Sequence, residues 1–390
     1  MLPILRALRD DGPVSRAELG DRLGLTRPRL TSEVERLVKA GFLAEAGMAA
    51  SRGGRRSTLV EIHPRLRFAA VDLGAGSIDV EVVNGRLEPL VAYREPADIR
   101  KGPKAILHRV SELLAKARAE GVYDRLDAVG IGVPGPVSFR DGVPVSPPIM
   151  PGWDRYPVRE LLAREHGCPV VVDNDVNIMA VGERHGGVAR SVDDFLFVKI
   201  GTGIGCGIHL TGGVYRGVDG CAGDIGHIQV DASGPTCSCG NTGCLEAVFS
   251  GAALARDALA AARSGTSPAL AERLARAHRA DTHELTAKDV ADGAAEGDVV
   301  CIQLIREGGR RLGGVLAALV SFANPSMIVI GGGLAQLGHV LLAEIRSVVY
   351  RRSLPLATGN LPVVLSELEG RAGVTGAAVL ASDAAFEQIP

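Results

Sequence analysis

The chain has 390 residues, which is too long for one ordinary hydrophobic core, so we expect at least two domains. Hydrophobic residues make up 46% and charged residues 23%, and no apolar run approaches the roughly 18 residues of a membrane-spanning helix. The composition therefore argues against a membrane protein. Because the start also lacks a charged-then-apolar leader, we expect a cytoplasmic protein without a membrane partner.

The net charge of −2 is unevenly distributed along the chain. Residues 1–65 hold twelve Lys and Arg against eight Asp and Glu, a net charge of +4, and the remainder carries −6. A basic head on an acidic body is typical of a small DNA-binding module joined to a domain that binds a small molecule.

The head shows the spacing of three short helices. Apolar residues recur at helical spacing over residues 2–9, and the Asp-Gly-Pro of residues 11–13 ends that helix. Ser15 and Glu18 form a capping-box pattern that begins a second helix.

A third helix is expected after a tight turn at Gly24, with Thr26 placed to cap it. Helix, short turn and helix form the helix-turn-helix pattern, whose last helix enters the major groove of DNA. The predicted buried stripe of the third helix is Leu30, Val34, Leu37 and Val38. The exposed candidates for contacts with bases and phosphates are Arg27, Arg29, Thr31, Ser32 and Arg36.

Two strand-like segments, residues 42–46 and 57–62, flank a basic stretch that is rich in glycine. A hairpin tip there can contact the DNA backbone or the minor groove as a wing. The candidate wing residues are Arg52, Arg55 and Arg56. Helical spacing alone also fits a small interaction module with solvated arginines, but the capped second helix, the arginine-bearing third helix and the basic wing together favour DNA binding.

Two glycine-rich turns follow apolar strands in the body: residues 72–77 (Asp-Leu-Gly-Ala-Gly-Ser) and 201–205 (Gly-Thr-Gly-Ile-Gly). The backbone N–H groups of such turns can bind phosphate, and an Asp there can hold Mg²⁺. Each turn alone also fits a tight hairpin that needs small residues, whereas the pair suggests two lobes that enclose a phosphate. A triple glycine at 331–333 either packs against an adenine or simply turns. The candidate nucleotide-binding residues are Asp72, Gly74, Ser77, Gly201, Thr202, Gly203 and Gly332.

An apolar strand at 170–172 ends in four polar residues, Asp173, Asn174, Asp175 and Asn177. The ends of strands are where open α/β sheets place ligands. Neighbouring carboxylate and amide groups suit sugar hydroxyls, which both donate and accept hydrogen bonds. A strand-terminating turn of Asn and Asp is the alternative. The density of polar residues favours a site, and in a kinase Asp175 would accept the proton of the attacking hydroxyl.

His227, Cys237, Cys239 and Cys244 supply one imidazole and three thiolates within 18 residues. In a chain without export features, clustered cysteines indicate metal binding rather than disulfides. These four ligands complete a tetrahedral zinc site with no open position for water, so we expect a structural zinc ion. The alternative is three reduced cysteines in a glycine-rich loop.

In chain order, the motifs VDLGAGS, GIGVPGPV, VDNDVN, GTGIGCGI, GDIGHI, CSCGNTGCLEA and NPSMIVIGGGL resemble those of the ROK family of repressors, unassigned reading frames and kinases. The head also resembles the winged heads of this family. The resemblance implies an N-terminal winged helix-turn-helix and an α/β two-lobed, actin-like (RNase H-like, sugar-kinase-type) body, usually assembled as a homodimer or homotetramer. It divides the chain into a DNA-binding domain (1–65), a small lobe (66–185, with a C-terminal helix at 370–390) and a large lobe with the zinc loop (186–369).

The resemblance also implies a sugar site and places the catalytic base of the family's kinases at Asp175. The family's sugar-contacting positions fall on Asn174, Asp175, Asp224, His227 and Glu246. Two departures stand out. Gly76 and Ser77 replace the Thr and Lys of the kinases' first turn, which weakens any use of ATP. Asp224 replaces a Glu, which shortens that arm by about 1.5 Å.

We therefore expect a sugar-responsive, DNA-binding transcriptional regulator that acts as a repressor. Its expected partners are operator DNA and a sugar or sugar derivative. The alternative is a glucokinase-like, ATP-dependent hexose kinase that carries a DNA-binding head, with ATP and Mg²⁺ as cofactors. Asp175 supports this alternative, and the first glycine turn argues against it. A third hypothesis is a binding module that answers to a protein partner through the body surface.

Overall fold

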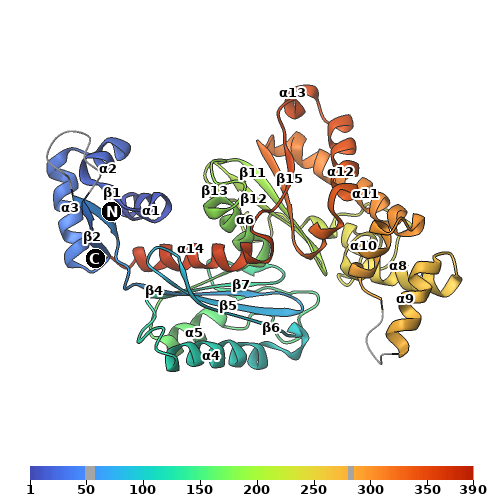
Figure 1. Cartoon of the computed structure of the whole chain (residues 1–390), viewed down its shortest axis with the longest axis horizontal. Helices are drawn as coiled ribbons and strands as arrows, with labels where there is room; N and C mark the ends of the chain where they lie inside the picture. The colour runs from blue at the N-terminus through green and yellow to red at the C-terminus, as the bar shows by residue number, and fades with distance from the viewer. Residues whose placement is uncertain (49–57, 280–284, 390) are drawn as a thin grey trace. The chain divides into compact units, whose positions relative to one another are not determined.

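The computed structural model describes residues 1–48, 58–279 and 285–389, whose helices and strands are drawn in Figure 1. The chain forms two compact units, residues 1–178 with 373–390 and residues 179–372, which we call the first and the second unit. Within the described ranges, no helix is both long and apolar enough to cross a membrane.

The first unit begins with a head of three helices and a small antiparallel sheet in the strand order β1-β3-β2. Its elements are α1 (Leu2–Asp11), β1 (Val14–Ser15), α2 (Arg16–Leu23), α3 (Arg27–Lys39), β2 (Leu43–Met48) and β3 (Thr58–Ile62). The three predicted helices and two predicted strands are present. The sequence pattern does not predict β1, because two residues are too few to show an alternation.

The ends of α2 and α3 are formed differently. Ser15 caps α2 as predicted, because its hydroxyl accepts a hydrogen bond from the Glu18 backbone N–H at 3.2 Å. Thr26 precedes α3, but its side chain makes no capping hydrogen bond. The prediction that Val38 is buried is wrong, since its side chain is 37% exposed. Position 38 lies about 100° around the helix from the buried Leu37, beyond the stripe that faces the head's core.

The rest of the first unit is the small lobe, a five-stranded sheet in the order β10-β7-β4-β5-β6 with helices on both faces. Strands β10, β7 and β4 are parallel, and β4, β5 and β6 are joined as antiparallel hairpins. Figure 1 shows α4 and α5 on one face and α14 on the other. The main elements are β4 (Arg67–Leu73), β5 (Ser77–Asn84), β6 (Pro89–Pro96), α4 (Pro103–Ala119), β7 (Ala128–Val133), α5 (Val158–His166), β10 (Val170–Asn174) and α14 (Ala372–Phe386). The short elements are η1 (Ile99–Lys101), β8 (Val137–Ser138) and β9 (Val143–Pro144).

The second unit is built on a five-stranded sheet in the order β13-β12-β11-β14-β15, in which β11, β14 and β15 are parallel. The strands are β11 (Phe195–Ile200), β12 (Ile204–Leu210), β13 (Gly213–Val214), β14 (Met327–Gly331) and β15 (Val363–Leu365). The helices are α7 (Leu245–Val248), α8 (Gly251–Ser264), α9 (Pro268–Arg279), α10 (Ala287–Ala295), α11 (Val299–Ala323), α12 (Gly338–Arg352) and α13 (Pro355–Thr358), with single turns η2 (Ile225–His227), η3 (Gly333–Leu337) and η4 (Glu369–Arg371). Helix α6 (Asp175–Gly186) begins in the first unit and ends in the second.

The candidate ligand-binding segments follow from this topology. In the small lobe, the turn that begins at Asp72 and the polar group that begins at Asp173 stand at the carboxyl ends of the parallel strands β4 and β10. In the second unit, Gly201 and Gly332 follow the neighbouring parallel strands β11 and β14. Each unit therefore presents its glycine-rich or polar turns at the sheet edge where α/β proteins bind ligands.

Candidate functional site

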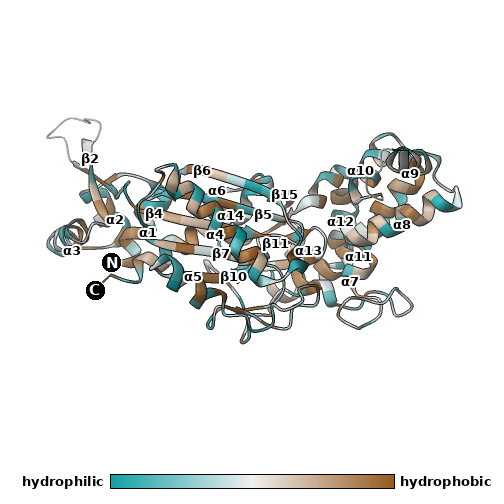
Figure 2. Cartoon of the chain, turned by 90° about the horizontal axis from the view of Figure 1, so that it is seen from below, coloured by the Kyte–Doolittle hydropathy of each residue, from teal (hydrophilic) through white to brown (hydrophobic). Residues whose placement is uncertain are grey.

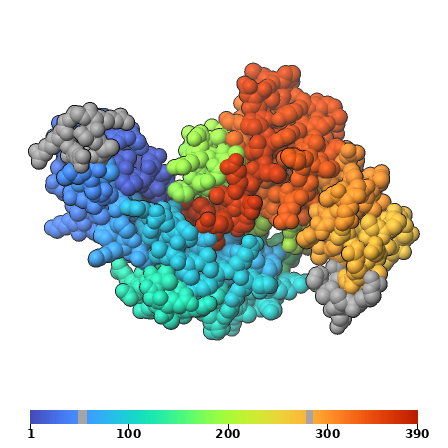
Figure 3. All heavy atoms as spheres, viewed as in Figure 1, coloured from blue at the N-terminus to red at the C-terminus, as the bar shows by residue number. Residues whose placement is uncertain are grey.

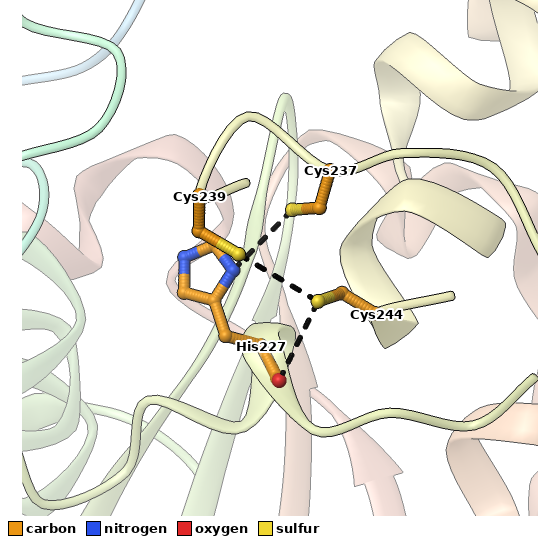
Figure 4. Close-up of side chains that lie close together, drawn as sticks. All are labelled: His227, Cys237, Cys239 and Cys244. Carbon is orange, nitrogen blue, oxygen red and sulfur yellow. Dashed lines mark hydrogen bonds between the residues drawn. The ribbon is translucent and has the colours of Figure 1, made fainter. Parts of the chain in front are cut away.

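Four side chains of the second unit converge on one point: His227, Cys237, Cys239 and Cys244 (Figure 4). One ligand atom from each lies within 4.8 Å of all the others. The Cys237 Sγ atom is 3.5 Å from His227 Nδ1, and the Cys239 Sγ atom is 3.7 Å from Cys244 Sγ. The last separation is far beyond the roughly 2 Å of a disulfide, so the thiols are free to act as metal ligands.

The local fold of the loop explains why these residues meet. The Cys237 N–H donates to the Asn241 carbonyl at 2.7 Å, and the Gly240 N–H donates back to the Cys237 carbonyl at 3.0 Å. This tight turn requires the positive φ of 89° at Gly240. Its two cysteines therefore project from one short turn toward His227 in η2 and Cys244 at the start of α7.

The protonation of the thiols suits metal binding. The pKa of Cys239 is lowered to about 7, chiefly because the backbone N–H of Asn241 donates to its sulfur. Burial and the neighbouring thiols raise the pKa of Cys244 to about 12, so this side chain gives up its proton only when a cation compensates the charge. Three sulfurs and one imidazole nitrogen at these separations fit a tetrahedral zinc ion.

Two of the predicted sugar-binding residues lie beside the metal-ligand cluster. His227 directs Nδ1 toward Cys237, and its Nε2 is 3.9 Å from the Asp224 carboxylate. Glu246 lies in α7 and accepts a hydrogen bond from the Ile204 N–H at 3.1 Å. Burial raises the pKa of both carboxyl groups, and His227 partly offsets the shift in each. Asp224, His227 and Glu246 thus form one electrostatically connected group.

Glu246 also joins this group to the second glycine turn. A methyl group at Gly203 would collide with its carboxylate, so a larger residue there would displace the Glu246 side chain. The Gly201 N–H donates to the Gly203 carbonyl at 2.9 Å, while the side chain of Thr202 is exposed. At Gly332, which has φ of 85°, an added methyl would meet the Ile200 backbone. The predicted nucleotide-binding residues of the second unit therefore share one crowded sheet edge.

The polar side chains that follow β10 form most of their hydrogen bonds with nearby backbone groups. The Asn174 side-chain oxygen accepts hydrogen bonds from the N–H groups of Val176 at 2.8 Å and Asn177 at 3.3 Å, as a cap of α6 does. Its amide group donates to the Gly135 carbonyl at 2.7 Å. Asp173 accepts from the Asn174 N–H and from the Asn177 amide. These contacts stabilise the turn that holds the buried Asp175 at the start of α6.

The first glycine turn is a closed hairpin. The Gly74 N–H donates to the Ser77 carbonyl at 2.9 Å. The Ser77 hydroxyl donates to the Asp79 carboxylate at 3.1 Å, along β5, rather than replacing the Thr hydroxyl of the kinases. Asp72 is buried at the end of β4. The turn thus keeps its acidic residue, while its one hydroxyl group is bonded within the hairpin.

In the head, α3 presents the predicted DNA-binding side chains. Arg27, Arg29, Ser32 and Arg36 are exposed, and Thr31 is half-buried. Among the residues that the structure describes, none of the three guanidinium groups forms an ion pair. The predicted wing residues Arg52, Arg55 and Arg56 lie outside the described residues.

The sequence patterns give no role to Glu183, whose side chain is completely buried in α6. It accepts hydrogen bonds from the Val188 N–H at 3.1 Å and from the Ser366 hydroxyl. Burial raises the pKa of its carboxyl group. The local signal in the sequence is weak, since this acidic residue directly follows the short apolar stretch of residues 178–182 and precedes Arg184.

Comparison with known proteins agrees with this geometry. Residues 68–384 match the ROK family, and residues 2–57 match the MarR family. A xylose repressor of Caldicellulosiruptor bescii is 30% identical over 380 residues, which cover 96% of this chain and 93% of the relative.

Two solved structures differ in how much of this chain they match. A ROK family transcriptional regulator, a homologue of the E. coli MLC protein, has a TM-score of 0.83 at 27% identity and covers 100% of this chain and 98% of its own. A ROK family glucokinase from Streptomyces griseus, in complex with glucose and AMPPNP, has a TM-score of 0.70 at 32% identity, but covers 81% of this chain and 99% of its own. The predicted winged head and actin-like, sugar-kinase-type body are confirmed, and the chain belongs to the ROK family, with a MarR-type winged helix at its N-terminus.

Proposed function

We propose that this protein is a sugar-responsive repressor that binds operator DNA through its head. One observation carries the proposal: the similarity to a repressor spans head and body together, over 96% of the chain, whereas the glucokinase structure covers 81% and accounts for a body alone. A kinase has no need of a winged helix with three exposed arginines on its third helix.

The head reads DNA with α3. Arg27 and Arg29 stand in its first turn and Arg36 near its end, so they can reach base edges and the flanking phosphates when the helix enters a major groove. Arg52, Arg55 and Arg56 serve as the wing. Two copies in a homodimer, or two pairs in a homotetramer, present two heads to two operator half-sites.

The body binds the sugar. The proposed sugar-binding residues are Asp224, His227 and Glu246 in the second unit and Asn174 and Asp175 in the first. Carboxyl groups with raised pKa values can, when protonated, both donate to and accept from sugar hydroxyls. Because Asn174 already has three hydrogen-bond partners, only one of its amide hydrogens remains for a sugar. The division into a head (1–65), a small lobe (66–185 with 370–390) and a large lobe (186–369) is part of this proposal.

Zinc serves as a structural ion held by His227, Cys237, Cys239 and Cys244. When bound, it supplies cross-linking of the loop rather than an activated water, since the four protein ligands fill its tetrahedral positions. The imidazole contributes Nδ1 to the metal side and keeps Nε2 toward Asp224. The metal thereby fixes the ring that faces the sugar.

An ATP-dependent hexose kinase is the second candidate. The buried Asp175 at the end of β10 favours it, because a general base occupies that place in the family's kinases. The first glycine turn opposes it, since Gly76 and Ser77 bring neither cation nor free hydroxyl group to a phosphate. In this case the candidate residues for ATP and Mg²⁺ would be Asp72 and Gly74 in the first unit and Gly201 and Gly332 in the second.

A titration of operator DNA tests the proposal. DNA fragments selected in vitro with the full-length protein are titrated in the presence and absence of D-xylose, D-glucose and N-acetyl-D-glucosamine. We expect at least one sugar to change the operator Kd by about 5-fold or more. Failure to select any specific DNA would contradict a DNA-binding repressor. Operator binding that no sugar changes would favour control by a protein partner. ADP release with D-glucose that is abolished by Asp175→Asn would establish the kinase instead.

A further inference from the structure

Helix α14 runs across the whole small lobe, and most of its residues are apolar (Figure 2). Near its middle, a methyl group on Gly130 of β7 would collide with the Ala377 carbonyl. At its start, a methyl group on Gly373 would collide with the Asp72 carboxylate of the first glycine turn. The helix is therefore seated directly on the sheet, and red atoms at the end of the chain lie on the blue and cyan atoms of this lobe (Figure 3).

The far end of α14 contacts the head. Arg9 of α1 has a side chain that is only 5% exposed. Its Nη1 atom donates to the Asp383 carboxylate at 2.7 Å, to the Ser382 hydroxyl at 3.0 Å and to the Val379 carbonyl at 3.5 Å. Burial lowers the pKa of Arg9, but Asp383 and Asp10 more than offset this, so the guanidinium stays charged.

Two further contacts complete this junction. Arg6, one turn earlier on α1, donates to both oxygens of Asp383 at 3.1 and 3.3 Å. Phe386, the last residue of α14, meets the ring of Phe42 in the head edge-on, with centroids 6.2 Å apart, and that of Phe68 in β4 at 6.4 Å. The helix end is thus held by charge on one side and by aromatic packing on the other.

The charged part of the junction fixes an orientation. An apolar contact tolerates sliding, whereas the Arg9 guanidinium is held from both sides. Its Nε and Nη2 atoms donate to Asp10 of α1 at 2.7 and 3.2 Å, and its Nη1 atom donates to the three acceptors of α14. A shift of α1 therefore breaks the defined contacts to α14, while the charge stays paired with Asp10. A second attachment, the ion pair of Arg86 with Glu61 in β3, lies beside the covalent link between head and lobe. The head is therefore held at its link and at α14, and the latter contact sets its angle.

We propose that α14 transmits the state of the body to the head, with Arg6, Arg9, Ser382 and Asp383 as the joint. Its first residues adjoin Asp72 and follow the point, residue 372, where the chain leaves the second unit. A ligand that displaces this start moves the helix end and, through the joint, rotates α1. This inference rests on the proposed function, because it names the route by which sugar binding reaches the DNA-binding head.

The joint is tested with Asp383→Asn, which keeps the size of the side chain and removes the charge that both arginines share. Arg9→Met is the second variant, and Arg22→Gln is the matched control. Arg22 also lies in the head, but pairs only with Asp11 and Glu18 among the described residues and does not touch α14. Hydrogen exchange of α1 in the full-length protein reports whether the joint has opened.

Two measurements on selected operator DNA report the coupling. The first is the ratio of operator Kd values with and without D-xylose, D-glucose or N-acetyl-D-glucosamine, expected at about 5 to 150 in the wild type and at about 2 or less in both joint variants. The second is the loss of affinity when five base pairs are inserted between half-sites. We expect a loss of about 10-fold or more for the wild type and for Arg22→Gln, because fixed heads cannot follow the displaced half-site. The two joint variants, whose heads are no longer fixed, should lose operator affinity by about 3-fold or less.

A wild-type sugar ratio and spacing penalty in variants whose α1 exchanges faster would overturn the inference while leaving the proposed function intact. The same holds if α1 exchange in both variants equals that of the wild type, because the joint would then not hold the head. A wild-type protein that selects no specific DNA would overturn both proposals together.

Discussion

Two polar clusters of this chain, residues 173–177 and 227–244, are dense in ligand-type side chains but are built in opposite ways. In the first, Asp173 and Asn174 turn toward backbone groups, so most of their hydrogen bonds stabilise the start of α6. In the second, the three sulfurs and the imidazole turn toward one another, within 4.8 Å. A dense group of polar residues therefore indicates a ligand site only when their ligand atoms face a shared point rather than the local backbone.

The largest expected effect comes from breaking the metal-ligand cluster. Cys244→Ser, or removal of metal by a strong chelator, should destabilise the second unit by more than about 3 kcal/mol, because the fully buried Cys244 anchors both the loop and the start of α7. Metal analysis by plasma mass spectrometry and thermal unfolding followed by circular dichroism measure the two consequences.

Cys221→Ser is the control for this experiment, since Cys221 is exposed and lies outside the cluster. It should keep one zinc per chain and the wild-type Tm. A purified protein with no bound zinc and with a Tm that does not respond to chelator would show that the loop is held by its hydrogen bonds alone.

A smaller effect is expected at the other cluster. Asn174→Ala should destabilise the first unit by about 1–2 kcal/mol, because it removes the cap of α6 and the hydrogen bond to Gly135. Asn174→Ser should restore about half of the loss, since a hydroxyl can cap the helix but is too short to reach Gly135. Urea unfolding in the absence of sugar measures both variants.

Stability and sugar affinity should respond differently to substitutions at Asn174 and Asp175. A loss of sugar affinity in Asn174→Ala without any loss of stability would contradict our view that the Asn174 side chain mainly forms hydrogen bonds that stabilise the local backbone. Asp175→Asn provides the contrast, because the proposed function places this carboxyl group at the sugar and we expect its loss to weaken sugar binding.

Glu183 extends the comparison to a single carboxyl group that, like Asp173, is satisfied by its surroundings. Its pKa is raised by burial, so the folded protein binds its proton more tightly than the unfolded chain does. Its contribution to stability is therefore full below the unfolded pKa and is lost as the pH rises through the folded value. The free energy of unfolding of Glu183→Gln should gain on that of the wild type as the pH rises above the unfolded pKa of a glutamate, because only the wild type loses this contribution. Parallel pH dependences for the two proteins would show that the carboxyl group titrates normally.

The sequence predicts the parts of this molecule that depend on neighbouring residues. Helical spacing locates α1 to α3, strand-turn-strand patterns locate both glycine turns, and the cysteines mark the loop that brings them together. The sequence pattern wrongly predicts that Val38 is buried, and it predicts a capping hydrogen bond from Thr26 that is not formed. Burial and capping at a helix end depend on what packs there.

What the sequence does not predict are contacts between distant residues. The bond from Asn174 to Gly135 spans 39 positions, and the pair of Arg9 with Asp383 spans 374. Neither has a local signature, since Arg9 looks like any exposed charge on a short amphipathic helix. Only the packing of α14 against the head reveals that this guanidinium is buried and what it binds.

If sugar and operator DNA act on one another through this chain, each must change the affinity of the protein for the other. Calorimetry gives the sugar Kd with and without saturating operator, and fluorescence anisotropy gives the operator Kd with and without saturating sugar. We expect the two ratios to be equal, at about 5-fold or more, because coupling between two sites is reciprocal. A sugar that binds equally well to the free and the operator-bound protein would contradict this expectation.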